Sequence, residues 1–444
     1  MSVETRVAPA PARDLGREAG ECAAGGGDRL RLLLVGNPDY AAGAAHGGNL
    51  RLYGCARELV AAGHEVYLVV RRRPTDDPEV KAKCLEGLKA DGVITDHFEI
   101  EYRRPRLRGK LARLLFHPAL GNLLLRGAQA EAASALGPIV AAKRADACVF
   151  SARDLLFMLP AARRSSGAVV DWVDSYFLYH FREARLYFRE RRLTSALGSL
   201  QAMAEAFVEE RYYGRQADFN LAVSPVDKSY LDRATGRPGR NRVLPNGVEA
   251  REAVACAKVP GRIIFTGMMD FPPNYKSALW FIDEVFPLLR GRGVRLVIAG
   301  GNPVEELRAR ACEDVEVTGF VEDIRREIAR SELYVAPLVC GGGFKNKVVE
   351  AVSAGTFVAG TSMAVEFLGP DARRHLLVAD EPRAMADAIL AYLQEPQKYA
   401  PDLEAVTRII REELTWAAAA RGLAAVAREA AGERAALSPR GVGR

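Results

Sequence analysis

The sequence lacks the features that would place it in a membrane, outside the cell or on nucleic acid. No apolar run approaches the roughly 18 residues of a membrane-spanning helix, so no transmembrane segment is expected. The seven cysteines stand singly, without a CxxC pair or matching histidine spacing, which favours free thiols in a reducing cytosol over disulfides or zinc ligands. The net charge of +6 over 444 residues is mild and argues against a nucleic-acid partner. These absences indicate a cytoplasmic protein.

The two ends of the chain read as unstructured. Residues 1–28 are rich in Ala, Pro, Gly and charge and lack the apolar core of a secretion signal, so we expect a disordered leader. A disordered tail is expected at 433–444. No internal repeat is evident between these ends.

Between the ends, short apolar runs alternate with helical patterns, which predicts βαβ units and parallel sheets covered on both faces. One such series begins at residues 30–36 and ends at a Gly-, Pro- and Arg-rich linker around 233–241, and a second series follows it. The fold class is therefore α/β, with two Rossmann-like, doubly wound domains at 29–236 and 241–400 facing a central cleft. An amphipathic segment at 401–432 is expected to cross back to the first domain.

A glycine-rich stretch in the second domain, VCGGGFKNKVVEAVSAG, follows an apolar strand and opens a helix. Glycines lack a Cβ, so their N–H groups can approach a ligand closely while the helix directs its positive end to the same place. Lys345 and Lys347 lie in the first turn, where the helix dipole disfavours cations, so a bound anion would relieve the conflict. The stretch predicts a diphosphate cradle at three glycines, Gly341, Gly342 and Gly343.

Glu350 shares a helical face with Lys347 and Asn346, three and four residues earlier. Its two acceptor oxygens suit a ribose diol beside the cradle. Alternatively, Glu350 only pairs with these neighbours on a solvated surface and the glycines form a flexible turn. The residues alone leave both interpretations open.

The run GGGFKNKVVEAVSAGTFVAGTSMAVEFL resembles the donor-binding segment of family 4 glycosyltransferases of the GT-B fold, particularly sugar transferases associated with exopolysaccharide systems. Segments 244–249, 263–290 and 317–338 resemble further pieces of that family in the same order. The resemblance covers almost all of the second domain, whereas the first fits only through its pattern, its Gly-rich first loop and VVDWVDSY. It implies transfer of a sugar from a nucleotide diphosphate sugar to an acceptor, with retention of configuration and without a metal or other cofactor.

The resemblance also implies roles for individual residues. Glu350 matches the second glutamate of the family's E-x7-E pattern, which holds the ribose hydroxyls. The first glutamate would fall at Gly342, so a side-chain contact to the transferred sugar is missing. We expect backbone N–H groups to replace it, at Gly342, Gly343 and Phe344.

The phosphate grip departs from the family pattern. Gly267 matches the glycine that ends the family's F-x-G strand, but Met268 stands where an arginine is usual and Lys276 comes late. The grip is therefore expected to shift to Lys345 and Lys347.

Two asparagines have structural alternatives. Asn274 in PPNYK is a candidate for contact with donor or acceptor, and equally for capping the following helix. In LPNGV, Pro245 fixes φ and Gly247 allows a positive φ, which together favour a turn. We therefore interpret Asn246 as a structural residue of that turn.

In the first domain, the loop AAHGGN follows the first strand and should face the cleft. His46 is a candidate there for the acceptor or the donor phosphates, with Gly47 and Gly48 allowing close approach; a solvated loop histidine is the alternative. Arg51 follows on the helix, where the exopolysaccharide relatives also carry an arginine, and it is a further candidate for orienting the acceptor.

Four further side chains at predicted strand ends are candidates for orienting the acceptor: Arg153, Asp154, Asp171 and Asp174. Asp171 and Asp174 do not form the D-x-D metal motif of the other major glycosyltransferase fold, so no metal is implied.

Substitution at an anomeric carbon needs a good leaving group and a positioned hydroxyl rather than a protein nucleophile. No Ser/His/Asp or Cys/His arrangement has convincing context. The resemblance implies same-face attack, in which the donor's own phosphate takes the acceptor proton. The candidate catalytic residues are Lys347, Glu350 and His46.

Two basic segments, 101–116 and 181–192, mix arginines with apolar residues. Both could rest on an anionic membrane and meet a lipid-linked acceptor, or could be solvated helix faces. A sugar or a small molecule is equally open as acceptor, and the oligomeric state is not readable.

Two other functions use the same architecture. A nucleotide-sugar 2-epimerase would epimerise the free donor without an acceptor, although no supporting acid/base set is found in the first domain. A non-catalytic partner subunit would bind a nucleotide sugar without releasing nucleotide.

Overall fold

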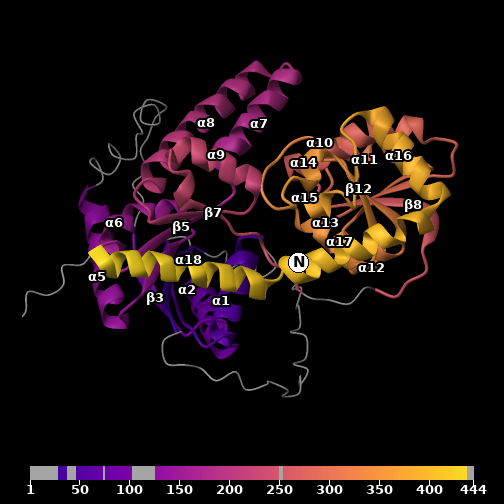
Figure 1. Ribbon diagram of the computed structural model, residues 1–444. Helices are drawn as coiled ribbons and strands as arrows, with labels where there is room; N and C mark the ends of the chain where they lie inside the picture. The colour runs from indigo at the N-terminus through magenta and orange to yellow at the C-terminus, as the bar shows by residue number, and fades with distance from the viewer. Residues whose placement is uncertain (1–28, 38–46, 74–75, 103–125, 250–253, 438–444) are drawn as a thin grey trace, which may run out of the picture.

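The computed structural model describes residues 29–37, 47–73, 76–102, 126–249 and 254–437 (Figure 1). They form two parallel sheets, one of seven and one of six strands, with helices packed around each. This confirms the predicted pair of Rossmann-like domains. The expected leader at 1–28 and most of the basic segment 101–116 lie outside the described residues.

The sheet of the first domain has the order β3-β2-β1-β4-β5-β6-β7. Its strands are β1 (Arg31–Gly36), β2 (Glu65–Arg72), β3 (Asp96–Glu101), β4 (Ala147–Phe150), β5 (Gly167–Val173), β6 (Phe219–Ala222) and β7 (Asn241–Val243). The central strands are almost wholly buried, as strands covered on both faces must be. The order reverses between β1 and β4, and loops that follow such a pair in doubly wound sheets are the usual place for a ligand.

The helices of the first domain begin and end at recognisable signals. They are α1 (Gly47–Ala61), α2 (Pro78–Ala90), α5 (Arg126–Lys143), η2 (Arg153–Met158), α6 (Leu159–Ala162), α7 (Tyr176–Arg189), α8 (Leu193–Gly214), α9 (Pro225–Thr235) and η3 (Pro238–Arg240). Ser175 caps α7 by accepting the N–H of Leu178, and Ser224 caps α9 ahead of Pro225. The two long helices α7 and α8 pack against each other as a hairpin.

The boundary between the domains differs from the expectation. Residues 241–243 form β7, which pairs with β6 and completes the first sheet rather than opening the second domain. In the Gly- and Pro-rich stretch before β7, α9 ends at Gly236 in the left-handed conformation and η3 follows. The linker prediction was wrong because a turn between two elements has the same composition as a linker between domains.

The sheet of the second domain has the order β10-β9-β8-β11-β12-β13 and reverses between β8 and β11. Its strands are β8 (Val259–Thr266), β9 (Arg295–Ala299), β10 (Val315–Gly319), β11 (Ser331–Ala336), β12 (Phe357–Gly360) and β13 (Leu377–Val378). Its helices are α10 (Pro272–Trp280), η4 (Phe281–Val285), η5 (Phe286–Leu288), α11 (Glu305–Arg308), α12 (Ile324–Ala329), α13 (Asn346–Ser353), α14 (Ser362–Val365), α15 (Pro370–Arg373), α16 (Pro382–Gln394) and η6 (Pro396–Tyr399).

The last two helices divide between the domains. In α17 (Ala400–Glu413), Val406 and Ile410 are buried in the core of the second domain. Only α18 (Trp416–Leu437) crosses back, where it joins the core on one face of the first sheet through Trp416, Leu423 and its alanines. The expectation of one segment packing back from residue 401 is therefore wrong for α17 and right for α18.

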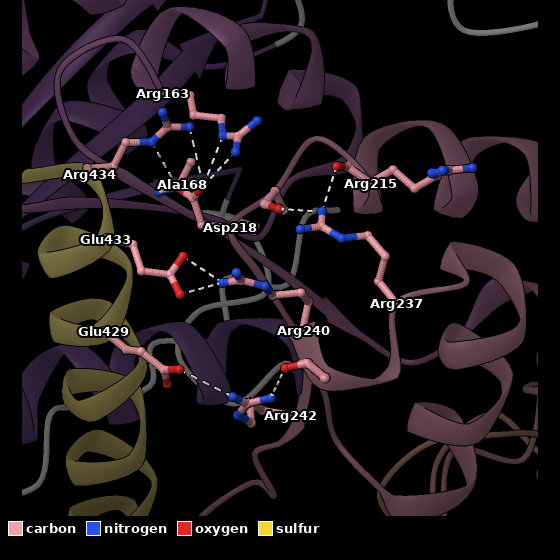
Figure 2. A network of polar contacts seen from close by, with 12 residues as sticks. Arg163, Ala168, Arg215, Asp218, Arg237, Arg240, Arg242, Glu429, Glu433 and Arg434 are labelled. Atoms are coloured by element: carbon pink, nitrogen blue, oxygen red, sulfur yellow. Dashed lines mark hydrogen bonds and ion pairs between the residues drawn. The ribbon is translucent and has the colours of Figure 1, made fainter. Parts of the chain in front are cut away.

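Ion pairs fix the far end of α18 to the first domain (Figure 2). Three side chains of α18 take part: Glu433 pairs with Arg240 at 2.6 Å, Arg434 with Asp218 at 3.3 Å and Glu429 with Arg242 at 3.4 Å. The helix runs to Leu437, so the expected tail does not begin at residue 433.

The two chain crossings between the domains lie side by side. The N–H of Val248 donates to the carbonyl of Leu414 at 2.8 Å, and Val248 forms a bridge with Thr415. Both connections therefore leave the first domain at one point, beside the start of α18.

Candidate functional site

The reversal of strand order in the second sheet brings two predicted segments together. Gly267 follows β8, and the glycine loop at residues 341–343 follows β11, the neighbouring strand. A Cβ on Gly267 would lie 2.6 Å from the Asn274 amide nitrogen and 3.0 Å from Lys347 Nζ. The predicted donor residues Gly267, Asn274 and Lys347 therefore meet in one place.

Lys347 points its ammonium group at this place. Its Nζ donates to Asn274 Oδ1 at 2.5 Å and lies 4.7 Å from the centre of the Phe265 ring. Burial lowers the pKa of Lys347 to about 7, and the nearby charge of Lys345 lowers it further. A bound phosphate would favour the charged form and restore the pKa.

Asn274 does not cap α10, which was one of its two interpretations. The cap position of α10 is Phe271, and no side chain caps it. Asn274 is buried, and its amide donates to the carbonyl of Met268 at 2.9 Å, which fixes its oxygen towards Lys347.

Lys345 does not present its ammonium as expected. The side chain is buried and turns back on its own loop, donating to the carbonyls of Gly342 at 2.5 Å and Gly343 at 2.7 Å. Burial lowers the pKa of Lys345, while the carboxylates of Glu366 and Asp174 raise it. Its charge stabilises the loop, and Lys347 is the better placed of the two for a phosphate.

The remaining donor candidates differ in what they offer. Glu350 is exposed on α13, one turn beyond Lys347. The Phe344 ring packs on Phe367, with centroids 4.5 Å apart, and its backbone N–H remains the group that we expect to contact a donor. A Cβ on Gly342 would meet no described atom within 4 Å.

Asp174 of the first domain lies against the glycine loop. A Cβ on Gly343 would fall 1.9 Å from Asp174 Oδ1, and Gly343 has φ 71°. Burial raises the pKa of Asp174 to about 6, with the charge of Asp227 adding to the shift. The carboxyl ends of the two sheets therefore face each other here, with an acidic group beside the cradle.

Two more buried carboxyl groups, Glu210 and Asp227, surround the start of α7. Glu210 accepts from the Ser175 hydroxyl and from the N–H of Phe177, both at 3.2 Å. Asp227 accepts the N–H of Ser175 at 3.0 Å. Burial raises the pKa of Glu210 to about 7 and also raises that of Asp227. These groups hold α7, and with it Asp174, in place.

The raised pKa of Glu210 makes stability depend on pH. Between its ordinary value of 4.5 and about 7, the folded protein keeps a proton that the unfolded chain has released, so the free energy of unfolding falls as pH rises. Glu210→Gln removes this loss, and at pH about 8 it should stabilise the protein by roughly 1–3 kcal/mol relative to wild type. Melting curves at several pH values check this, with Glu205→Gln on the same helix as control. An equal gain near pH 4.5 would contradict the explanation.

Two ion pairs join α7 to the second domain. Arg182 binds Glu366 through two contacts of 2.6 Å and donates to the carbonyl of Gly341 at 2.9 Å. Lys276 pairs with Glu190 at 2.8 Å, so its charge is already used and it does not replace the missing arginine.

Arg51 and Asp171 form a buried pair rather than an open acceptor site. Arg51 Nε lies 2.7 Å and Nη2 2.9 Å from the two carboxylate oxygens. Nη1 donates to the carbonyl of Leu244 and to Asn246 Oδ1, both at 2.9 Å. Every contact is internal, so the acceptor assignment of this pair is replaced by a structural one that holds the crossing between the domains. Asn246 is structural, as interpreted.

Arg153 and Asp154 are also engaged inside the first domain. Arg153 pairs with Glu209 and lies over the Tyr176 ring, 3.9 Å from its centre. Asp154 pairs with Arg71 at 2.7 Å. Both side chains are thus paired within the first domain, and their role toward an acceptor stays a prediction.

The Gly-rich loop of the first domain is described only in part. The backbone of Gly47 and Gly48 opens α1, and His46 lies outside the described residues.

Sequence reasoning missed Arg182, Glu366, Glu210 and Asp227. Arg182 had been counted only as part of a basic segment. The helix-capping serines Ser175 and Ser224 are visible in the sequence, and their hydroxyls donate to Glu210 and Asp227. No local sequence pattern shows that Glu210 would reach Ser175 from another helix.

The two halves of the chain match different glycosyltransferase families. Residues 45–252 match the family described as Glycosyltransferase Family 4, and residues 260–395 match Glycosyl transferases group 1. The boundary between the matches falls close to the crossing described above.

Individual curated proteins also match parts of the chain. A phosphatidyl-myo-inositol mannosyltransferase of Mycobacterium leprae is 29% identical over 191 residues, which cover 39% of this chain and 49% of the relative. An uncharacterized 44.6 kDa protein in the cps region of Klebsiella pneumoniae is 23% identical over 141 residues, covering 29% of this chain and 36% of that protein. The chain therefore matches only about half or less of the length of these curated relatives.

Among solved structures, HepE of Anabaena in complex with UDP superimposes with a TM-score of 0.60 at 15% sequence identity. The superposition covers 89% of this chain and 99% of HepE. At that identity the likeness shows the fold alone.

Proposed function

We propose, from the premise that this chain is a family 4 glycosyltransferase with the GT-B fold, that it transfers a sugar from a nucleoside diphosphate sugar to an acceptor with retention of configuration and without a metal. The observation that carries the proposal is the meeting of Gly267, Asn274 and Lys347 beside the glycine loop, at the reversal of the second sheet. HepE, which shares the fold, is described in complex with UDP, which supports a nucleotide donor.

In the proposed complex the second domain holds the donor. Lys347 binds the diphosphate together with N–H groups of the glycine loop, and Glu350 accepts hydrogen bonds from the ribose hydroxyls. The acceptor enters from the first domain, near Asp174 and the exposed ring of Tyr176. This division follows from Asp174 being the acidic group of the first domain that lies against the loop.

The proposed step needs no protein nucleophile. The bond between the anomeric carbon and the phosphate oxygen breaks, and the acceptor oxygen forms its bond on the same face. The acceptor proton passes to the departing phosphate, which leaves as nucleoside diphosphate. Lys347 stabilises the charge that develops on that phosphate.

A thermal-shift screen of nucleoside diphosphates and their sugars tests the donor site. Glu350→Ala should weaken the best binder about tenfold, which corresponds to roughly 1.4 kcal/mol of lost ligand stabilisation. The unliganded melting temperature should stay nearly unchanged because Glu350 is exposed. Glu284→Ala, which removes an exposed carboxylate of η4, is the matched control. An undiminished ligand shift in Glu350→Ala would overturn the ribose assignment.

A further inference from the structure

The tip of the hairpin formed by α7 and α8 carries apolar side chains that the fold leaves exposed. Figure 1 shows this hairpin projecting from the body of the first domain. Phe188 near the end of α7 is 46% exposed, and Leu193 and Leu197 at the start of α8 are 61% and 64% exposed. Exposed apolar residues normally occur singly and scattered over a protein surface. Here three large ones lie together at one tip.

The same tip is strongly basic. Exposed arginines surround the apolar residues: Arg185, Arg189, Arg191 and Arg192. The one acidic residue from 185 to 197, Glu190, is engaged by Lys276 of the second domain. Four arginines and one glutamate leave a formal charge of +3 on the segment. Apolar side chains set among arginines are typical of surfaces that rest in the headgroup region of an anionic bilayer.

The hairpin also connects the tip to the candidate site. Helix α7 begins just after Asp174, and Arg182 in its middle binds the carbonyl of Gly341. Its 14 residues span about 21 Å at 1.5 Å per residue.

We propose that this tip, residues 185–197, docks the protein on an anionic lipid bilayer. The apolar side chains enter the headgroup region and the arginines contact lipid phosphates. Docking sets the bilayer surface within one length of α7, about 21 Å, of the glycine loop. An acceptor carried on a lipid then has the site within reach. The docking itself depends on neither donor nor acceptor, so it stands or falls separately from the proposed reaction.

Vesicle co-sedimentation tests the docking. The full chain should bind phosphatidylcholine vesicles that contain phosphatidylglycerol, bind pure phosphatidylcholine weakly, and dissociate at high salt. Leu193→Ser with Leu197→Ser, and separately Arg185→Ser with Arg189→Ser, should each lower the partition coefficient about tenfold. The matched controls lie in the second domain: Phe320→Ser, which removes an aromatic side chain of a residue 84% exposed, and Arg408→Ser with Arg411→Ser on α17. These should bind as wild type does.

Three results would overturn the docking: no binding of wild type to anionic vesicles, equal losses in the controls, or tip variants that lose self-association in sedimentation equilibrium instead. Tryptophan fluorescence of single-substitution variants gives an independent measurement of docking. Leu197→Trp should show a blue-shifted emission component with anionic vesicles, and Phe320→Trp should not. The absence of any difference between them would also reject the tip as the docking surface.

Within the described residues, no helix combines the length and apolar character that crossing a bilayer would require.

Discussion

Replacing Lys347 with alanine should weaken the binding of a nucleoside diphosphate about a hundredfold. A hydrogen bond between a charged donor and a phosphate contributes roughly 1.5–3 kcal/mol, and Lys347 is the ammonium group placed beside Gly267. The unliganded protein should unfold within about 1 kcal/mol of wild type, because the charge that is removed is itself opposed by burial. Titration calorimetry with the best binder of the screen measures the affinity.

The lowered pKa of Lys347 adds a pH dependence to this effect. Below its pKa of about 7 the ammonium is already charged, whereas above it binding of the phosphate must first take up a proton. The affinity advantage of wild type over Lys347→Ala should therefore shrink as pH rises from about 6 to about 8.5. Lys276→Ala is the control, since that lysine is paired with Glu190. Equal losses in both variants would remove Lys347 from the phosphate site.

Gly343→Ala should lower turnover at least about a hundredfold and destabilise the protein by roughly 2–3 kcal/mol. The new Cβ would overlap the Asp174 carboxylate, 1.9 Å away, on a backbone that already has φ 71°. Relief requires the Asp174 carboxylate or the glycine loop to move, and either movement changes the contact between the acceptor side and the donor side. Melting temperature and nucleotide release measure the two parts.

Gly342→Ala is the matched control, because its Cβ would meet no described atom within 4 Å and should leave the melting temperature close to that of wild type. In the Gly343→Ala background, Asp174→Gly should recover part of the lost stability, since it removes the overlapping atoms but not the backbone strain. No recovery would mean that the two residues are not in contact.

The sequence predicts the glycine loop and its partners well because they follow from topology. Parallel strands that alternate with helices place the loops after neighbouring strands at one edge, so Gly267 and residues 341–343 had to come together. The same alternation predicts both sheets. The error at β7 arose because a helix end followed by a short turn has the composition of a linker.

The parts that the sequence does not predict depend on distant partners. Arg51 finds Asp171 across 120 residues, and Arg182 finds Glu366 across 184. The sequence places Lys345 and Lys347 two residues apart in one helical turn, whereas in the structure α13 begins at Asn346 and Lys345 is the residue before it. The carboxylates of Asp174, Asp227 and Glu366 favour a buried Lys345 that stabilises the loop carbonyls. Lys347 lies instead against Asn274 and the Phe265 ring. The direction of a side chain at such a junction is decided by contacts from both domains.

The position of α18 has a consequence for synthesis on the ribosome. One face of the first sheet is completed by a helix that begins at Trp416, after the whole second domain in chain order, so the apolar surface under it stays uncovered until that domain has been translated. The second domain has all its strands and α17 by residue 413 and can fold earlier. We therefore expect the domain translated second to mature first.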